Sequence, residues 1–423
     1  MPAVDVCLIT SSPLASNPRA VKEADALVAD GYSVHIVARE PCAVVRPLEE
    51  TLVSRSRWSV SYVKLGNRLG RKGRTAINRV NRGLFSTVGG SSIGLAVRAH
   101  HSLSLPLFRE ARRFEAKLYV GHNLAALPAA VMAAEHAGGY IGFDAEDFHS
   151  GELAPADGAC QELRLRRIIE KHYLPRCHYI TAASPGIAEA YRSAYGVQSM
   201  VVLNAMQRCA VSRQGRAGCT EEPRGKDFAL YWFSQTISLD RGLETAIEAV
   251  SLMAARTHIY IRGTATKNVK QTLRVLASRL GVGDRVHFLA PAPPDNMVTL
   301  AACYDVGLSL EQSAPVNRAI CLTNKVFTYL SAGIPQLMTT TPAQAEFGFK
   351  LGAAAILVPE NDPGEWAVRL DKLLLCPERV CEARKHARLL GEEKYSWELE
   401  RNRFLGEVKR VLGSGRNPKF NRF

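Results

Sequence analysis

Two cationic residues in this chain lie where a binding site for an anion would need them. Arg241 opens an expected helix over residues 242–253, and Lys325 lies at the start of another over 324–332. A cation at a helix N-terminus opposes the helix dipole unless an anion is bound there. The two positions therefore predict an anion site, although a solvated lysine would also account for Lys325.

A second set of polar residues follows two expected strands in the first half of the chain. His122 comes directly after YVG, and Asp144 and Glu146 lie at and after the end of YIGFDA. Either carboxylate could bind hydroxyl groups or help to remove a proton, whereas His122 could also be a buried structural residue. Arg19, at the start of the first expected helix, could bind phosphate.

These residues would be positioned by strands and helices that alternate through nearly the whole chain. The order predicts an α/β fold of two Rossmann-like, doubly wound parallel sheets in tandem, with ligands at the carboxyl ends of the strands. The expected strands cover 4–10, 33–39, 116–121, 140–145, 178–184, 200–205, 228–233, 258–263, 285–290, 305–310, 334–339 and 353–358. The expected helices include 18–30, 124–136, 161–173, 185–195, 242–253, 269–280, 295–303 and 324–332.

The length of 423 residues is too great for one hydrophobic core, so at least two domains are expected. A hydrophobic content of 47% and a mean hydropathy of -0.07 exclude a mostly disordered chain. We expect an N-terminal domain over 1–206, a linker over 207–226, a C-terminal domain over 227–395, a helix over 396–412 that packs back on the first domain, and a basic tail over 413–423.

The cysteine spacing and the lack of nucleotide-binding glycine motifs limit which cofactors the protein could bind and where in the cell it could be. Ten cysteines without a C-x-x-C pair favour reduced thiols in a cytosolic protein over a disulfide framework or a zinc site. No secretory signal, G-x-G-x-x-G loop or P-loop is found, which weighs against a dinucleotide enzyme. We therefore expect a cytoplasmic protein, or one peripheral on the inner face of a membrane, with no metal and no cofactor.

The net charge of +14 is concentrated in one segment. Residues 51–109 contain eleven basic residues and no acidic one, so the rest of the chain is nearly balanced. Apolar residues recur about every four positions there, as in a weak helix, but Gly66, Gly70 and Gly73 argue against a firm one. The segment is interpreted as a solvated loop, as a surface for anionic membrane or lipid phosphate, or, with few stacking aromatics, as a nucleic-acid contact.

Several segments, taken in order over nearly the whole chain, resemble the retaining GT-B glycosyltransferases of the large family-four group (glycosyl transferases group 1). The matching segments are SPLASNPRAVKEADALVADGYSVHIVA, YVGHNLAALPAAVMAAEHAGGYIGFDAEDFHS, ASPGIAEAYRSAYGVQSMVVLNA, WFSQTISLDRGLETAIEA, IYIRGTAT, LTNKVFTYLSAGIP and SWELERNRFL. Each is weak alone, but their shared order makes the resemblance specific.

The resemblance implies a nucleotide-sugar donor, with the diphosphate held in the C-terminal half and the acceptor in the N-terminal half. It implies donor binding by Gln235, Arg241, Gly263, Asn324, Lys325 and Thr328, catalytic roles for His122, Asp144 and Glu146, and phosphate binding by Arg19. In the resembled family a histidine at position 122 contacts the transferred sugar.

The chain also departs from the family pattern. The usual Glu-x7-Glu pair is missing, because Ile320 and Thr328 stand at its two positions, and Glu311 lies too far upstream to replace the first. Gln235 stands where a basic residue is common, and Glu146 replaces a histidine. These changes fit a divergent subgroup with its own donor, or a weakened enzyme.

Together these observations predict a retaining glycosyltransferase of the hexosyltransferase type, which moves a sugar from a nucleotide-sugar donor to a glycan or lipid-linked acceptor. The expected setting is cell-surface polysaccharide or glycolipid assembly, with residues 51–109 on an anionic membrane surface or lipid phosphate and no nucleic-acid partner. The alternatives are a nucleotide-sugar epimerase of the same fold and a non-catalytic nucleotide-sugar-binding partner. A nucleic-acid binder is a more distant one.

Overall fold

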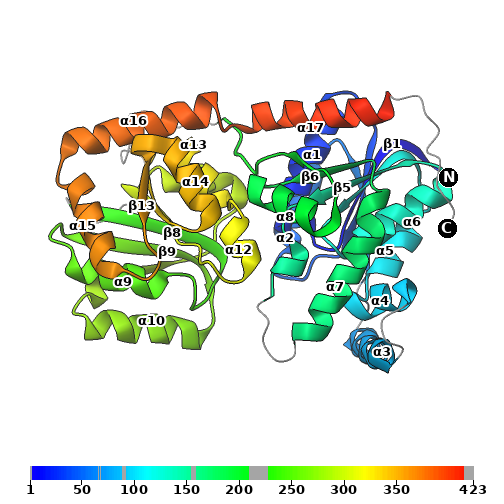
Figure 1. Cartoon of the computed structure of the whole chain (residues 1–423), viewed down its shortest axis with the longest axis horizontal. Helices are drawn as coiled ribbons and strands as arrows, with labels where there is room; N and C mark the ends of the chain where they lie inside the picture. The colour runs from blue at the N-terminus through cyan, green and yellow to red at the C-terminus, as the bar shows by residue number, and fades with distance from the viewer. Residues whose placement is uncertain are drawn as a thin grey trace. The chain divides into compact units, whose positions relative to one another are not determined.

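Two parallel sheets, each covered by helices, organise the chain (Figure 1). The computed structural model describes residues 2–64, 66, 68–87, 92–153, 159–208 and 227–413. One unit contains the chain up to Val202 together with the part from Arg401 onward, and the other runs from Leu203 to Glu400. The predicted α/β class with two Rossmann-like sheets is confirmed.

The first sheet has seven parallel strands in the order β3-β2-β1-β4-β5-β6-β7. The order reverses between β1 and β4, which is where open parallel sheets bind their ligands. The central strand β1 is buried from Val6 to Thr10. The strands are β1 Ala3–Thr10, β2 Val34–Arg39, β3 Ser59–Val63, β4 Glu115–His122, β5 Tyr140–Ala145, β6 Tyr179–Ala182 and β7 Met200–Val201.

Local capping fixes where several helices of this unit begin. The Asn17 side chain accepts from the amide of Ala20 to open α1, and Ser184 accepts from the amide of Ile187 to open α8. The helices are α1 Pro18–Ala29, α2 Arg46–Arg55, α3 Arg68–Thr87, α4 Ile93–His100, α5 Ser104–Ala111, α6 Leu127–Ala137, α7 Ala159–Tyr173, α8 Pro185–Tyr195 and α17 Trp397–Leu412.

The basic segment is more ordered than its sequence indicates. The structure folds it into α2, β3, α3, α4 and α5, and α3 runs over 20 residues despite Gly70 and Gly73. Phe85 is buried, and the Asn78 amide donates to the carbonyls of Arg98 and Ala99 on α4. Tertiary contacts therefore supply the stability that helix propensity lacks, and the expectation of no firm helix was wrong.

The second sheet has six parallel strands in the order β10-β9-β8-β11-β12-β13, and its order reverses between β8 and β11. The strands are β8 Phe228–Ile237, β9 Thr257–Ala265, β10 Val286–Leu289, β11 Val306–Ser309, β12 Gln336–Thr339 and β13 Ala355–Val358. The helices are α9 Leu243–Leu252, α10 Lys267–Arg279, α11 Met297–Ala301, α12 Val316–Ile320, α13 Asn324–Ser331, α14 Pro342–Leu351, α15 Pro363–Leu374 and α16 Pro377–Glu393. The 3-10 turns of the chain are η1 Leu14–Ser16, η2 His149–Gly151, η3 Leu174–Arg176, η4 Gly283–Arg285, η5 Pro294–Asn296 and η6 Gly352–Ala354.

Large aromatic side chains fill the cores of both units. Trp232 and Trp366 are buried in the second unit, and Tyr119 and Phe143 in the first. From Arg401 onward α17 packs against the first unit, where Lys409 pairs with Asp30 at 2.9 Å. Most of the predicted linker and tail, residues 209–226 and 414–423, lies outside the described residues.

The cysteines follow the reduced pattern at most described positions. Cys303 is the exception, because it is disulfide-bonded. The expectation of reduced thiols throughout is therefore wrong at this position. The free cysteines among the described residues are Cys7, Cys42, Cys160, Cys177, Cys321, Cys376 and Cys381.

Gly263 on β9 is required by strand packing. Its φ is 148°, and an added Cβ would lie 2.3 Å from the carbonyl oxygen of Ser234, beside the irregular part of β8. We expect Gly263→Ala to lower the free energy of unfolding by about 3 kcal/mol, since strained backbone and a clash with a main-chain atom add together.

The matched control is Gly281→Ala, in which φ is 72° but no atom lies within 4 Å of the added Cβ. Backbone strain alone should then cost about 1 kcal/mol. Urea unfolding of both variants measures the difference, and equal losses would show that the approach to Ser234 does not matter.

Candidate functional site

The carboxyl edge of the first sheet carries a small polar network at the point where the strand order reverses. The Ser11 hydroxyl donates to the Asn123 side chain at 2.8 Å, and the Asn123 amide donates to the Thr10 hydroxyl at 3.3 Å. Asn123 has a φ of 68°, which is uncommon for a residue other than glycine. Strained residues of this kind gather at functional sites, and the sequence analysis did not single out Asn123.

Arg19 lies beneath this edge and is fully buried. Its guanidinium forms two parallel hydrogen bonds to Asp144, at 2.7 and 2.8 Å, and a third to the Val202 carbonyl. Thr181 also donates to Asp144, at 2.6 Å. Because a phosphate could reach Arg19 only by displacing Asp144, Arg19 holds the strands and α1 together, contrary to the predicted phosphate-binding role.

His122 is buried in the same cluster. Its Nε2 lies 3.1 Å from Glu23 and its Nδ1 lies 3.3 Å from Asp144. Burial alone would lower the pKa of His122, but Glu23 and then Asp144 outweigh it and raise the pKa to about 10. His122 is thus buried between two carboxylates, and its predicted contact with a transferred sugar stays a prediction.

Glu23 completes the cluster and was missed by the sequence analysis. It follows Arg19 by one turn of α1, at 3.8 Å from the guanidinium, and it is fully buried. Burial first, and then the charge of Asp144, raise the pKa of Glu23. The i, i+4 spacing on a predicted helix was the available signal, but it also describes a solvent-exposed ion pair.

The oxygens and nitrogens of Glu23, His122 and Asp144 lie within 4.8 Å of one another, as ligands of a cation would. The Arg19 guanidinium already supplies a positive charge to both Asp144 oxygens. The cluster is therefore charge-balanced by its own side chains.

Two further groups on this side have pKa values near neutrality. Burial, followed by the charge of Asp147, raises the pKa of Glu146 to about 7. Burial, followed by the charge of Arg19, lowers the pKa of Lys22 to about 7. Both side chains are half-buried, so they can meet a ligand, and titration near pH 7 suits proton transfer.

In the second sheet, the reversal point carries Arg241. The chain leaves β8, passes Asp240 at a φ of 66° and Gly242 at 71°, and enters α9. Its N-cap residue is Gly242, and in the described part of the chain no side-chain cap hydrogen bond forms at the start of α9, so its first amide groups are available to another acceptor. The Arg241 Nε is buried and has no hydrogen-bond partner among the described residues, which leaves a donor beside the helix start.

Lys325 lies at the start of α13, which also has no side-chain cap. Its ammonium pairs with Glu311 at 2.8 Å and lies 5.7 Å from the centre of a Trp232 ring. Burial would raise the pKa of Glu311, but Lys325 and then Arg241 and Arg318 hold it below the usual range. One buried carboxylate thus faces three cations, so the site keeps an excess of positive charge.

Arg318, on α12, is a third residue that the sequence analysis missed, after Asn123 and Glu23. It donates to the Asp240 carbonyl and to its side chain, both at 3.2 Å. Arg318 is 77 positions from Arg241 in the sequence, so no local pattern indicates that the two side chains belong to one site. Arg318 supplies a positive charge to a site in which Gln235 stands where a basic residue is common.

The remaining predicted donor residues lie in different environments. Gln235 is exposed on β8, and Asn324 is half-buried at the first position of α13. Thr328 is fully buried and donates to the Asn324 carbonyl one turn earlier, so its hydroxyl is occupied inside the helix. Gly263 serves strand packing, as described above. The structure therefore gathers Arg241 and Lys325 but places Thr328 in the core.

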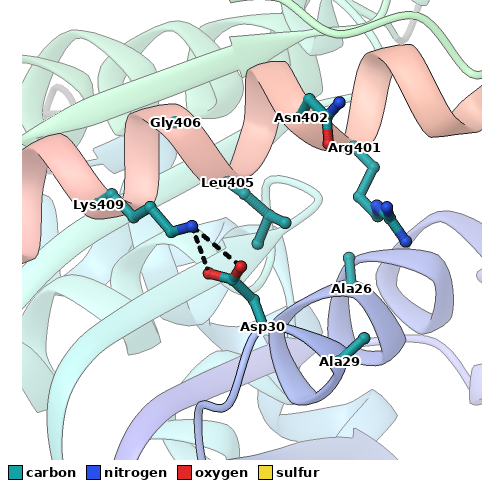
Figure 2. Close-up of a pocket in the computed structure, with 8 residues that line it drawn as sticks. All are labelled: Ala26, Ala29, Asp30, Arg401, Asn402, Leu405, Gly406 and Lys409. Atoms are coloured by element: carbon teal, nitrogen blue, oxygen red, sulfur yellow. Dashed lines mark hydrogen bonds and ion pairs between the residues drawn. The ribbon is translucent and has the colours of Figure 1, made fainter.

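A shallow pocket on the first unit lies away from these residues (Figure 2). It is formed between the end of α1 and α17, and the Asp30–Lys409 ion pair crosses it. Arg19 and Glu23 lie in the first half of α1, whereas Ala26, Ala29 and Asp30 line the pocket. The pocket is therefore not the candidate site.

No protein-family model and no curated protein matches this chain. Its structure is similar to solved structures over nearly its whole length. HepE from Anabaena, in complex with UDP and glucose, is 14% identical, with a TM-score of 0.68 over 96% of this chain and 100% of that one. Sucrose-phosphate synthase from Thermosynechococcus elongatus is 14% identical, with a TM-score of 0.71 over 98% and 100%.

WaaG, a glycosyltransferase involved in lipopolysaccharide biosynthesis, is 13% identical, with a TM-score of 0.60 over 98% of this chain and 100% of that one. At such identities the likeness establishes the fold. The predicted GT-B fold, with two Rossmann-like parallel sheets, is therefore confirmed. Within the described ranges, no helix combines the length and the apolar character needed to cross a bilayer.

Proposed function

We propose that this chain is a retaining glycosyltransferase that moves a sugar from a nucleotide-sugar donor to a glycan or lipid-linked acceptor. The single observation that carries the proposal is the cationic site at the reversal point of the second sheet. There Arg241 has a buried, unpartnered Nε beside the uncapped start of α9. HepE has been crystallised with UDP-glucose, and sucrose-phosphate synthase and WaaG share its fold.

The leaving group explains why such a site would be needed. As the bond between the sugar carbon and the diphosphate oxygen breaks, negative charge grows on the diphosphate. Arg241, Arg318 and Lys325 would stabilise that charge together with the first amides of α9 and α13. Since Glu311 pairs with Lys325 and Asp240 pairs with Arg318, one net positive charge, that of Arg241, remains for the diphosphate.

The transfer itself would keep the anomeric configuration. The acceptor oxygen would bond to the sugar carbon on the face that the diphosphate leaves, and its proton would pass to the departing diphosphate oxygen. The diphosphate oxygen thus takes up the proton that the acceptor loses, and no separate base is needed. The cations of the site would stabilise the diphosphate charge, so this scheme does not require a metal ion.

The acceptor would bind at the carboxyl edge of the first sheet. Glu146 and Lys22 are half-buried titratable groups there, and either can hydrogen-bond a sugar hydroxyl. His122, Asp144 and Arg19 would act as positioning residues, because their buried network fixes the ends of β4 and β5 beneath the acceptor. We place the protein in the cytoplasm, peripheral on the inner face of a membrane, in cell-surface polysaccharide or glycolipid assembly.

A transfer assay tests the proposal. The full chain is incubated with UDP-, GDP-, CDP-, dTDP- and ADP-sugars and a lipid extract, and nucleoside diphosphate release and the new anomeric signal are followed by NMR. We expect one donor class to be consumed with retention only when acceptor is present. Conversion of the donor sugar without acceptor would show an epimerase instead, and binding without turnover would show a non-catalytic partner.

The pKa of Glu146 predicts a pH dependence. If the carboxylate must be ionised to hold the acceptor, kcat/KM rises about tenfold for each pH unit below 7 and levels off above it, because the pKa is raised to about 7. Glu146→Gln should remove this rising limb and lower the plateau.

The control is Glu135→Gln, which alters an exposed carboxylate on α6 that pairs with Arg176, and it should keep the rising limb. Persistence of the rising limb in Glu146→Gln would assign it to another group.

A further inference from the structure

The helix α3 presents an apolar stripe to solvent. Ile77 is 63% exposed, Val80 61% and Leu84 49%. At about 100° per residue, these three side chains fall within about 60° of one another on the helix. A Cβ built at Gly73, which lies between Ile77 and Val80 around the helix, would meet nothing within 4 Å, so α3 is open at that point of the stripe.

The opposite face of α3 is held firmly, so the helix cannot turn to hide the stripe. Phe85 is buried, with the Arg164 guanidinium 5.6 Å from its ring centre. Asn78 and Arg82 donate to carbonyl groups of α4, and Arg82 also pairs with Glu162 of α7. Figure 1 shows α3 at the margin of its unit, beside α4.

The charge around the stripe selects its partner. Residues 51–109 contain eleven basic residues and no acidic one. At about 100° per residue, Arg74 lies about 60° around α3 from Ile77 on one side of the stripe, and Arg79 about 100° from Val80 on the other. A second copy of the chain would bring two such positive surfaces together, which repulsion opposes. Nucleic acid would leave the apolar stripe unused, because its binding relies on phosphate contacts and on aromatic stacking. Apolar side chains bordered by cations fit the boundary between the headgroups and the acyl chains of an anionic bilayer.

We infer that α3 lies in the surface of an anionic membrane, with Ile77, Val80 and Leu84 in the acyl boundary and Arg74 and Arg79 at the lipid phosphates. The inference deepens the proposed function, on which it rests for the lipid-linked acceptor, because it names the surface that would present this acceptor. Helix α3 follows β3, at the carboxyl edge of the sheet where the acceptor would bind.

Vesicle sedimentation with the full chain tests the inference, using neutral phosphatidylcholine vesicles and vesicles that also contain phosphatidylglycerol. We expect binding to the anionic vesicles only, weakened by high salt. The Ile77→Ser/Val80→Ser/Leu84→Ser variant should bind at least tenfold less. The matched control, Leu252→Ser/Val275→Ser/Val368→Ser, alters equally exposed apolar residues of the other unit and should bind like the wild type.

An introduced indole locates the contact. Ile77→Trp fluorescence should be quenched by brominated acyl chains in anionic vesicles. Absence of vesicle binding, equal binding by the stripe variant, or absence of quenching would each overturn the inference. Binding of an acidic protein, and not of anionic vesicles, to the α3 stripe would also overturn it. Since the assay contains neither donor nor acceptor, its failure would leave the transferase proposal to the transfer assay.

Discussion

Arg241→Ala is expected to lower kcat/KM for sugar transfer by about 10² to 10³, because the side chain would stabilise charge that develops as the diphosphate leaves. The variant removes a buried donor that has no protein partner, so no internal hydrogen bond is lost. The fold should therefore tolerate the change. Nucleoside diphosphate affinity, measured by calorimetry, should fall together with the rate.

The matched control is Arg256→Ala. This arginine lies just before β9, at the amino edge of the same sheet, where it pairs with Asp227 and Asp284. Both variants lose one positive charge from the same unit, but only Arg241 lies at the carboxyl edge. An equal loss of activity in the two variants would mean that net charge, and not the position of Arg241, controls the rate.

Asp144→Ala is expected to give the largest loss of stability. It would leave the buried Arg19 guanidinium with one hydrogen bond, to the Val202 carbonyl, and with Glu23 at 3.8 Å, and it would remove an acceptor from Thr181. Removing one member of a buried ion pair costs about 3 to 5 kcal/mol, and here Glu23 would be left as the carboxylate that faces both Arg19 and His122. Amide hydrogen exchange in β4 and β5 of the full chain measures this loss within the first unit.

The control for Asp144→Ala is Glu189→Ala, which breaks the exposed pair with Arg192 on α8. An exposed ion pair contributes about 0 to 1 kcal/mol, so exchange should barely change. The double variant Arg19→Met/Asp144→Leu, which removes both charges at similar volume, should recover part of the loss. Unchanged protection in Asp144→Ala would contradict the account of a buried network.

The alternation of strands and helices could be predicted because each element has a clear period. The strand expected over 4–10 is β1, which begins one residue earlier, and the helix expected over 185–195 is α8 with the same bounds. The helix α3 could not be predicted, since its glycines oppose it and its support comes from α4 and α7. Local propensity does not contain that tertiary contribution.

The part of the candidate site that could be predicted consists of cationic residues at the N-terminal ends of helices. Arg241 and Lys325 lie at the beginnings of α9 and α13, as expected. The burial of Arg19 was not predictable. Like Arg241, Arg19 lies at the start of a helix in the sequence, but the fold pairs it with Asp144, which is 125 positions away. Glu23 was missed for the same reason, since only the assembled sheet brings it to His122.

Amide hydrogen exchange with nucleotides tests the central claim most directly. The full chain is measured with millimolar UDP, GDP, CDP, dTDP or ADP; at about 100 times the dissociation constant, a ligand adds roughly 2.7 kcal/mol of stability. The account predicts that one nucleotide slows exchange at the starts of α9 and α13 and leaves α10 unchanged. If no nucleotide slows exchange there, or if protection appears only in the first unit, the donor site proposed at Arg241 is contradicted.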